Sequence, residues 1–369
     1  MCDVPALRFP EFCGEWERHK LSEVCSFYSG GTPSSSKKEY YNGNIPFIRS
    51  GELHKDYTEL FITEAGLSNS AAKLVETGDL LLALYGATSG DIAISKIKGA
   101  INQAILCIRT KQNKKFIESV WNKHVERLLQ TYLQGGQGNL SADIVKNIPF
   151  YFANSDEQDK LAKFISLLDE RIVTQNKIIE KLETLIKGIR HNIFKQLRKN
   201  VGFNATIGNI LSFEQPQRYI VSSAEYSNDC TFTPVLTANK AFILGYTTET
   251  DGIYSKGDCI IIDDFTLDCK YVSFPFKVKS SAIKILTAKN KFILRYTYEY
   301  LKSLELSTEE HKRHYIADVQ PHSCVLPDEN ILKTIALVFE NLACKLANEQ
   351  SLVLILNKQK QYLLSKMFI

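Results

Sequence analysis

Two stretches of the chain carry apolar residues at alternating steps of four and three, and this pattern restricts the fold more than any other feature. Steps that average 3.5 residues are typical of a coiled-coil seam, so we predict a long helix over residues 155–199 and a second within 329–369. Ser155 suits the N-cap of the first helix because acidic residues occupy the turn that follows. The first seam comprises Leu161, Ile165, Leu168, Ile172, Gln175, Ile179, Leu182, Ile186, Ile189 and Ile193.

The second seam repeats the first at a constant offset of 174 residues. The polar residue Gln175 falls in register with Glu349, so even the interruption of the apolar pattern is repeated. A polar seam residue commonly fixes register or orientation, and the alternative is that both side chains are merely solvated where the seam opens. The second seam comprises Leu332, Ile335, Phe339, Leu342, Leu346, Glu349, Val353, Leu356, Lys360, Leu363 and Met367.

Each predicted helix follows a segment rich in strand-forming residues, and the two segments share landmarks in the same order. Gly78-Asp79 introduces an apolar run in the first segment, as Gly257-Asp258 does in the second, and both resemble a turn that feeds a buried strand. The pattern therefore predicts a duplication of the α+β class. Its parts are a first globule at 1–154, a spacer helix at 155–204, a second globule at 205–328 and a second spacer helix at 329–369.

The short connection after the first helix restricts how the two helices can pair. Only residues 200–204 separate this helix from the second globule, so that globule must start where the helix ends. The second helix then either runs outward with both seams in water or folds back and buries them. Burial of a Leu or Ile side chain is worth ~1.5–3 kcal/mol, which favours an antiparallel pair with one globule at each end.

Charge and cysteine content narrow the class of protein further. Residues 1–155 hold 17 basic and 16 acidic side chains and residues 201–328 hold 13 and 15, so any basic surface for a nucleic acid must be local. The nine cysteines include no CxxC pair, which favours buried reduced thiols over disulfides or a zinc site. No apolar run approaches the ~20 residues that span a bilayer and no signal peptide is present, so we expect a cytoplasmic protein without a membrane span.

Polar loops in both globules are candidate binding surfaces. Glycine lets backbone approach a ligand closely, Ser, Thr, Asn and Gln reach phosphate oxygens or base edges, and tyrosine packs on sugar or base. The alternative is that these loops are ordinary turns. The candidates are Gly30, Gly31, Thr32, Tyr85, Thr88, Gly136, Gln137, Asn139 and Ser141 in the first globule, and Asp264, Thr266, Lys270, Tyr271, Lys312, Arg313 and His314 in the second.

A series of short motifs, together with the duplicated helix, carries a family resemblance. The motifs are Leu7-Arg8-Phe9-Pro10, Gly14-Glu15-Trp16, Gly30-Gly31-Thr32-Pro33, Ile45-Pro46-Phe47-Ile48-Arg49, Gly78-Asp79-Leu80-Leu81, Tyr85-Gly86-Ala87-Thr88, Asn102-Gln103-Ala104, Gln137-Gly138-Asn139-Leu140-Ser141 and Asp156-Glu157-Gln158. In this order the chain resembles the specificity subunit of type I restriction–modification enzymes, of the kind with two repeats. The second globule departs from the first because it lacks the Gly-Thr-Pro loop and the Gly-Asn-Leu-Ser segment, so contacts cannot be transferred between them.

The resemblance implies a function for each part of the chain. Each β-rich globule would be a target recognition domain that reads one half of a bipartite, asymmetric sequence in double-stranded DNA. The antiparallel helices would set the spacing between the halves and dock two methyltransferase subunits, with two restriction subunits as further partners. The chain itself would hold no catalytic residue, metal or cofactor, since the partners would supply S-adenosylmethionine, ATP and Mg²⁺ chemistry. The resemblance also adds Arg49, Ser50 and Gln103 to the candidate DNA-binding residues.

Two alternatives from other classes remain open at this point. The spacing of Asp258, Asp268 and Lys270 loosely fits a metal-dependent nuclease, in which paired carboxylates hold a cation and the lysine lies beside the attacked phosphate. The other alternative is a coiled-coil scaffold that binds proteins and has no role on DNA.

Overall fold

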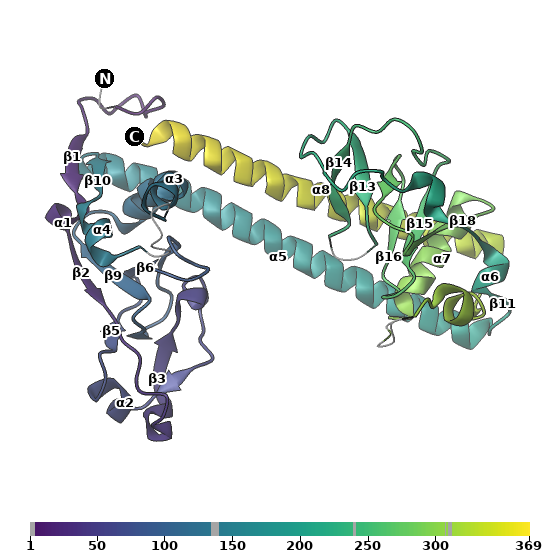
Figure 1. Cartoon of the computed structure of the whole chain (residues 1–369), viewed down its shortest axis with the longest axis horizontal. Helices are drawn as coiled ribbons and strands as arrows, with labels where there is room; N and C mark the ends of the chain where they lie inside the picture. The colour runs from purple at the N-terminus through teal and green to yellow at the C-terminus, as the bar shows by residue number, and fades with distance from the viewer. Residues whose placement is uncertain (1–3, 134–139, 239–240, 307, 309–311) are drawn as a thin grey trace. The chain divides into compact units, whose positions relative to one another are not determined.

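The computed structural model describes residues 4–133, 140–238, 241–306, 308 and 312–369 (Figure 1). The chain forms two compact units, the first made of Met1–Gln175 with Leu352–Ile369 and the second of Asn176–Ser351. Each unit therefore contains one β-rich globule and a part of both long helices. The four-part division at 154, 204 and 328 follows chain order and stays a prediction, since the compact units cut through both helices.

The two long helices are α5 (Ser155–Asn200) and α8 (Glu329–Met367). The cap of α5 lies one residue before the predicted Ser155, because the Asn154 side chain accepts a hydrogen bond from the backbone N–H of Glu157 at 2.9 Å. At the start of α8, the Asp328 side chain accepts from the N–H groups of Asn330 and Ile331, both at 3.1 Å. Side-chain oxygens thus satisfy N–H groups that a helix start leaves without partners.

Within each unit the two helices contribute apolar side chains to one core. In the first unit, Leu161 and Ile165 from the start of α5 share a core with Leu364 from the end of α8. In the second unit, Ile186 from the later part of α5 shares a core with Ile335 from the start of α8. The start of each helix therefore packs with the end of the other, which confirms the predicted antiparallel pairing.

The predicted seam residues point inward, and the polar pair is not simply solvated. Gln175 is only 7% exposed and Glu349 is half-buried, so the interpretation that open solvent surrounds both is not supported. The buried seam residues are Leu161, Ile165, Gln175, Leu182, Ile186, Leu332, Ile335, Phe339, Leu356 and Met367. The half-buried ones are Leu168, Ile172, Ile179, Ile189, Ile193, Leu342, Leu346, Glu349, Val353, Lys360 and Leu363.

The described residues of the first globule form three sheets. Its strands are β1 (Glu17–Lys20), β2 (Cys25–Ser29), β3 (Tyr41–Ile48), β4 (Phe61–Ile62), β5 (Lys73–Val75), β6 (Leu80–Ala83), β7 (Ile92–Ile94), β8 (Gly99–Ile101), β9 (Ile105–Thr110) and β10 (Pro149–Phe152). Its helices are α1 (Leu21–Val24), η1 (Lys38–Tyr40), η2 (Ser50–Glu52), α2 (Glu64–Ser68), α3 (Lys114–Leu133) and α4 (Ala142–Asn147). The sheets have the orders β2-β9-β6-β7, β4-β3-β8-β5 and β1-β10.

The globule of the second unit repeats this plan. Its strands are β11 (Ala205–Thr206), β12 (Leu211–Glu214), β13 (Thr233–Leu236), β14 (Ile243–Thr247), β15 (Cys259–Asp263), β16 (Cys269–Val272), β17 (Lys277–Val278), β18 (Ile283–Ala288) and β19 (Ser323–Cys324). Its helices are α6 (Ile207–Ile210), η3 (Pro216–Tyr219), α7 (Lys291–Ser303) and η4 (Tyr315–Val319). The sheets have the orders β12-β18-β15-β16, β14-β13-β17 and β11-β19.

Matching strands of the two globules pair in the same way. The ladder β12-β18-β15-β16 is antiparallel throughout, as β2-β9-β6-β7 is, and the parallel pair β13/β17 matches the parallel pair β3/β8. The predicted turns precede the central strands β6 and β15, and Gly78 and Gly257 adopt φ of 89° and 100°, a backbone region that favours glycine. Both central strands are buried along their whole length. The duplicated landmarks therefore correspond to a duplicated topology.

No helix among the described residues is long and apolar enough to cross a membrane.

A bidentate ion pair ties the N-terminal segment of the first unit to α5. The guanidinium of Arg8 donates to both carboxylate oxygens of Glu157 at 2.7 Å, and the indole N–H of Trp16 donates to one of them at 3.2 Å. Glu157 is only 1% exposed, so Arg8 and Trp16 supply hydrogen bonds that water cannot supply to the buried carboxylate.

We expect Arg8→Ala to lower the free energy of unfolding by ~3 kcal/mol, because it leaves a buried carboxylate without its counter-charge. Chemical denaturation of the full chain measures this loss. Arg18→Ala is the matched control, since Arg18 is exposed and makes no ion pair with any described residue. An equal effect of the two substitutions would contradict the structural role of the Arg8–Glu157 pair.

Candidate nucleic-acid interface

Four polar segments of the first globule meet at residues 101–105, where β8 ends and β9 begins. The N–H of Gly31 donates to the carbonyl of Ile101 at 3.2 Å, and the N–H of Asn102 donates to that of Ile48 at 3.4 Å. The N–H of Leu84 donates to the carbonyl of Ala104 at 2.8 Å. These bonds bring together the loops that carry Thr32, Arg49, Tyr85 and Gln103. We call this region the first strand-end cluster.

Two glycines allow the first of these loops to approach so closely. A Cβ atom on Gly30 would lie 1.9 Å from the carbonyl oxygen of Ile101, and one on Gly31 would lie 2.5 Å from the Cβ of Ala71. A side chain at either position would displace backbone. The approach places exposed Thr32 beside exposed Gln103, and the Thr32 hydroxyl donates to the Gln103 amide oxygen. These two polar side chains are therefore held at the surface of the cluster.

Arg49 is an exposed arginine fixed by a buried acid. Its Nη2 lies 2.8 Å from Oε1 of Glu52, its Nε lies 3.3 Å from Oε2, and its exposed fraction is 46%. Burial would raise the pKa of the Glu52 carboxyl, but hydrogen bonds from Arg49 and Thr58 outweigh burial and lower the pKa to about 2. The ionised carboxylate thus keeps the guanidinium in a defined orientation while leaving part of it accessible.

The remaining predicted residues of the first globule lie around this cluster. Ser50 directly follows Arg49 and is the first residue of η2. Tyr85 and Thr88 are half-buried in the loop after β6. The Ser141 hydroxyl caps α4 by accepting from the N–H of Ile144 at 3.1 Å. The N–H of Leu140 donates to the carbonyl of Leu84 at 2.8 Å, so the start of α4 also reaches the cluster. Gly136, Gln137 and Asn139 lie outside the described residues, and their role stays a prediction.

The second globule has a corresponding cluster at residues 278–284, between β17 and β18. The N–H of Lys279 donates to the carbonyl of Leu236 at 3.1 Å, and the N–H of Asp264 donates to that of Ala282 at 2.7 Å. The ends of β13 and β15 therefore meet here as the ends of β3 and β6 meet in the first globule. We call this region the second strand-end cluster.

Arg313 occupies the second cluster in an environment like that of Arg49. Its Nη1 lies 3.6 Å from Oδ2 of Asp264 and donates to the carbonyl of Ser281 at 3.3 Å, and its guanidinium lies 5.8 Å from the ring centroid of Phe265. Arg313 is 49% exposed, whereas Asp264 is 1% exposed and also contacts the ammonium of Lys284 at 3.1 Å. Each cluster thus presents a half-exposed arginine braced by a buried carboxylate.

The other predicted residues of the second globule are divided between this cluster and the interior. The backbone N–H of His314 donates to the carbonyl of Asp264 at 2.8 Å, while its ring is buried and lies 2.5 Å from Asp318. Lys312 and Thr266 are exposed, and each is within two residues of Arg313 or Asp264 in the sequence. Because Asp264 and His314 are enclosed, any contact of their side chains with DNA stays a prediction.

Lys270 and Tyr271 lie on β16 and do not belong to the second cluster. The Tyr271 hydroxyl donates to Asp258 Oδ2 at 2.8 Å, at the end of β15 opposite to Asp264. Sequence reasoning missed Gln215, Ser281 and Lys284, although the buried Lys284 ammonium donates to Gln215 at 2.8 Å within the cluster. The signal was the polar Ser280-Ser281 pair just before β18, which takes the place of Asn102-Gln103 before β9.

The register of β15 and β16 contradicts the nuclease alternative. Cys259 pairs with Val272 and Ile262 pairs with Cys269, so Asp258 and Asp268 lie at opposite ends of the hairpin. Asp268 lies opposite Asp263, five residues from Asp258, and a rise of ~3.3 Å per residue separates the two carboxylates by roughly 16 Å, too far to share one cation. Asp258 accepts instead from Tyr271, and the described residues contain no group of three or more His, Cys, Asp or Glu side chains suited to a metal ion.

Comparisons with known proteins agree with this architecture. Residues 14–184 match the family model of the type I restriction modification DNA specificity domain. The specificity subunit of the type I restriction enzyme EcoR124I/EcoR124II from Escherichia coli is 44% identical over 141 residues, which cover 36% of this chain and 35% of that protein. The MjaIX specificity subunit from Methanocaldococcus jannaschii is 24% identical over 414 residues, covering 96% of this chain and 92% of that protein.

A solved structure extends the likeness to the whole fold. The crystal structure of a type I restriction–modification S subunit from M. genitalium matches with a TM-score of 0.66 at 17% identity and covers 99% of both chains. The chain is thus similar to the specificity subunits of type I restriction–modification enzymes, and residues 14–184 match the specificity domain itself. Its match spans about a third of the length of the E. coli relative and 44% of the MjaVIII specificity subunit from M. jannaschii.

The close approach of the first loop yields a test of the first strand-end cluster. We expect Gly31→Ala to lower the free energy of unfolding by ~1–3 kcal/mol, because the new Cβ would collide with Ala71. Gly51→Ala is the matched control, since a Cβ on Gly51 meets no atom within 4 Å. Equal thermal unfolding of the two variants would contradict the described loop packing.

The Glu52 carboxyl yields a pH-dependent test. Its folded-state pKa of about 2 lies below the ordinary value of 4.5, so its stabilising effect is full above pH 4.5 and is lost as the pH falls toward 2. We therefore expect the difference in unfolding free energy between the unmodified chain and Glu52→Gln to shrink as the pH falls from 6 to 3. Glu59→Gln is the control at a largely exposed position, and a pH-independent difference for Glu52→Gln would contradict the assignment.

Proposed function

We propose that this chain is the DNA-recognition subunit of a type I restriction–modification complex and that each strand-end cluster reads one half of a bipartite, asymmetric DNA sequence. The observation that supports this proposal is the pair of globules with one topology and different exposed side chains. Equal frameworks would place two reading surfaces in equivalent settings, and unequal side chains would make the two half-sites differ.

The braced arginines suggest how base recognition would work. A guanidinium can donate two parallel hydrogen bonds to O6 and N7 of guanine in the major groove. The buried partners Glu52 and Asp264 limit the rotation of Arg49 and Arg313, so less conformational entropy would be lost on binding. Around them, Thr32, Gln103 and Ser281 supply neutral donors and acceptors suited to base edges or phosphate oxygens.

Methylation and cleavage of DNA would be carried out by partner subunits and not by this chain. Two methyltransferase subunits would dock on the paired helices and carry out adenine methylation with S-adenosylmethionine, and two restriction subunits would add ATP- and Mg²⁺-dependent cleavage. The helices would set the distance between the two half-sites. On this proposal the chain is non-catalytic and cytoplasmic, and duplex DNA is its ligand.

Mapping of methylated adenines tests the proposal in a host with and without this gene. We expect one bipartite, asymmetric motif that disappears when the gene is deleted and returns when it is restored. Unchanged methylation after deletion, with the methyltransferase partners present, would contradict the proposal.

Substitution of the braced arginines tests the assignment of one half-site to each globule. We expect Arg49→Ala to weaken recognition of one half-site by roughly 10- to 100-fold, and Arg313→Ala to weaken the other half-site by a similar factor, as the loss of a bidentate base contact would. Competition binding of the assembled methyltransferase to duplexes altered in one half at a time measures both effects. Arg18→Ala and Lys289→Ala are controls at exposed positions. Equal loss at both halves from either single substitution would contradict the model.

A further inference from the structure

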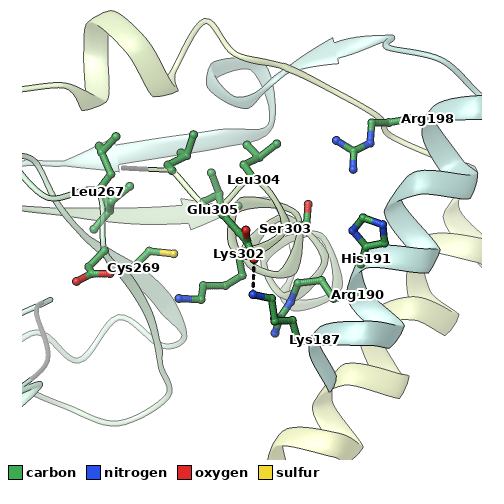
Figure 2. Close-up of a pocket in the computed structure, with 14 residues that line it drawn as sticks. Lys187, Arg190, His191, Arg198, Leu267, Cys269, Lys302, Ser303, Leu304 and Glu305 are labelled. Carbon is green, nitrogen blue, oxygen red and sulfur yellow. Dashed lines mark ion pairs between the residues drawn. The ribbon is translucent and has the colours of Figure 1, made fainter. Parts of the chain in front are cut away.

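Figure 2 shows a cleft in the second compact unit, whose described lining residues are different from those of the second strand-end cluster. Its volume of about 630 Å³ is in the range of small-molecule binding sites. One wall is a face of α5, another is the last turn of α7 with the residues that follow, and the third is the turn between β15 and β16. None of its lining residues belongs to the 278–284 segment, and Arg313 is not among them.

Basic side chains gather on the α5 wall. Lys187, His191 and Arg198 are separated by four and seven residues, so they lie on one side of the helix, and Arg190 lies beside them. Figure 2 shows these side chains along the same stretch of α5, opposite the end of α7 that carries Lys302. Two walls of one cleft therefore carry positive charge.

Two of these cations are neutralised by carboxylates. The ammonium of Lys187 lies 2.7 Å from Oε1 of Glu305, and Nη2 of Arg190 lies 2.8 Å from Oε2 of the buried Glu299. The charges of Lys187 and Arg190 are therefore balanced within the protein.

Arg198, His191 and Lys302 have no such partner among the described residues. The Nε of Arg198 donates to the carbonyl of Phe194 at 3.2 Å, which leaves both terminal nitrogens of its guanidinium available. No carboxylate of a described residue lies within 4.0 Å of a side-chain nitrogen of these three residues. Asp268 is the other acidic residue among the described lining residues, so within that set the basic groups without partners outnumber the acidic ones.

The floor of the cleft is apolar and uncharged. Leu267 and Leu301 are buried, and Leu304 completes this surface at the end of α7. Burial raises the pKa of the Cys269 thiol to about 11, so this side chain adds no negative charge near neutral pH. A ligand that fits both parts of the cleft carries an anionic group at one end and an apolar or aromatic body at the other.

We propose that this cleft binds a phosphate group attached to an apolar or aromatic body, as in a nucleoside monophosphate. The guanidinium of Arg198 and the ammonium of Lys302 would contact the phosphate oxygens with charge-assisted hydrogen bonds, and the leucines of the floor would contact the body. The phosphate comes from a free nucleotide or from the backbone of bound DNA, and the experiment below separates the two sources. The proposal stands apart from the half-site assignment, since it uses neither braced arginine.

Glu305 has a conformation that suits a competing role at the rim. Its φ of 47° lies in the left-handed region, which a residue other than glycine or asparagine rarely adopts. The Glu305 carboxylate pairs with the Lys187 ammonium, and that pairing lowers the pKa of the Glu305 carboxyl. A phosphate that enters the cleft would compete with this carboxylate for the Lys187 ammonium, so removal of the negative charge should strengthen binding.

Calorimetric titration of the full-length chain tests the proposal with inorganic phosphate, adenosine 5′-monophosphate and a short duplex without the methylation target as separate probes. We expect adenosine 5′-monophosphate to bind more tightly than inorganic phosphate. Arg198→Gln and Lys302→Met should each weaken its binding about tenfold, whereas Glu305→Gln should strengthen it a few-fold. Lys195→Gln is the matched control, because Lys195 is exposed on α5 and does not line the cleft.

The outcomes separate the two sources of phosphate and can overturn the site. Loss of nucleotide binding in Arg198→Gln and Lys302→Met, with thermal unfolding unchanged, supports a site for a free nucleotide. If only the duplex binds, and binds more weakly to these two variants, the site serves a backbone phosphate. Binding of every probe that is equal in all variants, or no binding of any probe at millimolar concentration, overturns the proposal.

Discussion

Burial of the seam of α5 and α8 is the interaction on which the rest of the structure depends. Each buried Leu or Ile contributes ~1.5–3 kcal/mol, and the same seam residues also complete the core of a globule. Leu161 and Ile165 contact the first globule while Ile335 and Phe339 contact the second. The helices are therefore part of both folding units, and a change in seam register would alter the cores as well as the helix pair.

The two globules share a strand arrangement but differ in the side chains that they expose. Equivalent strands have the same neighbours in both globules, apart from β5, which has no counterpart among the described strands of the second globule. The ends of these strands are brought together by backbone hydrogen bonds, so their convergence tolerates different side chains. Both clusters nevertheless contain an exposed arginine next to a buried acid, although Arg49 follows β3 and Arg313 precedes η4. The same arrangement, a guanidinium oriented by a buried carboxylate, thus forms from residues at different positions in the two globules.

Sequence periodicity predicted the helices, their antiparallel pairing and the duplication, because heptad spacing and repeated turns are local signals. It did not predict that Asp264 and His314 are enclosed, since the ion pair of Asp264 with Lys284 on β18 and the backbone bond between His314 and Asp264 are contacts between residues far apart in the sequence. The nuclease alternative was wrong for a related reason. Spacing along the chain placed Asp258 near Asp268, whereas antiparallel pairing of β15 with β16 puts them at opposite ends of a hairpin. The Gly-Thr-Pro motif did not predict which residue packs against Gly31, because its neighbour Ala71 is far away in the sequence.

The sharing of α8 has a consequence for how the chain acquires its structure during synthesis. The core around Trp16 and Phe116 is closed by Met367 and Phe368, which leave the ribosome more than two hundred residues after the strands they cover. Until then the first globule exposes aromatic surface, and contacts of such long sequence separation form slowly. Expression at reduced temperature or together with a chaperone is therefore the favourable route to folded protein.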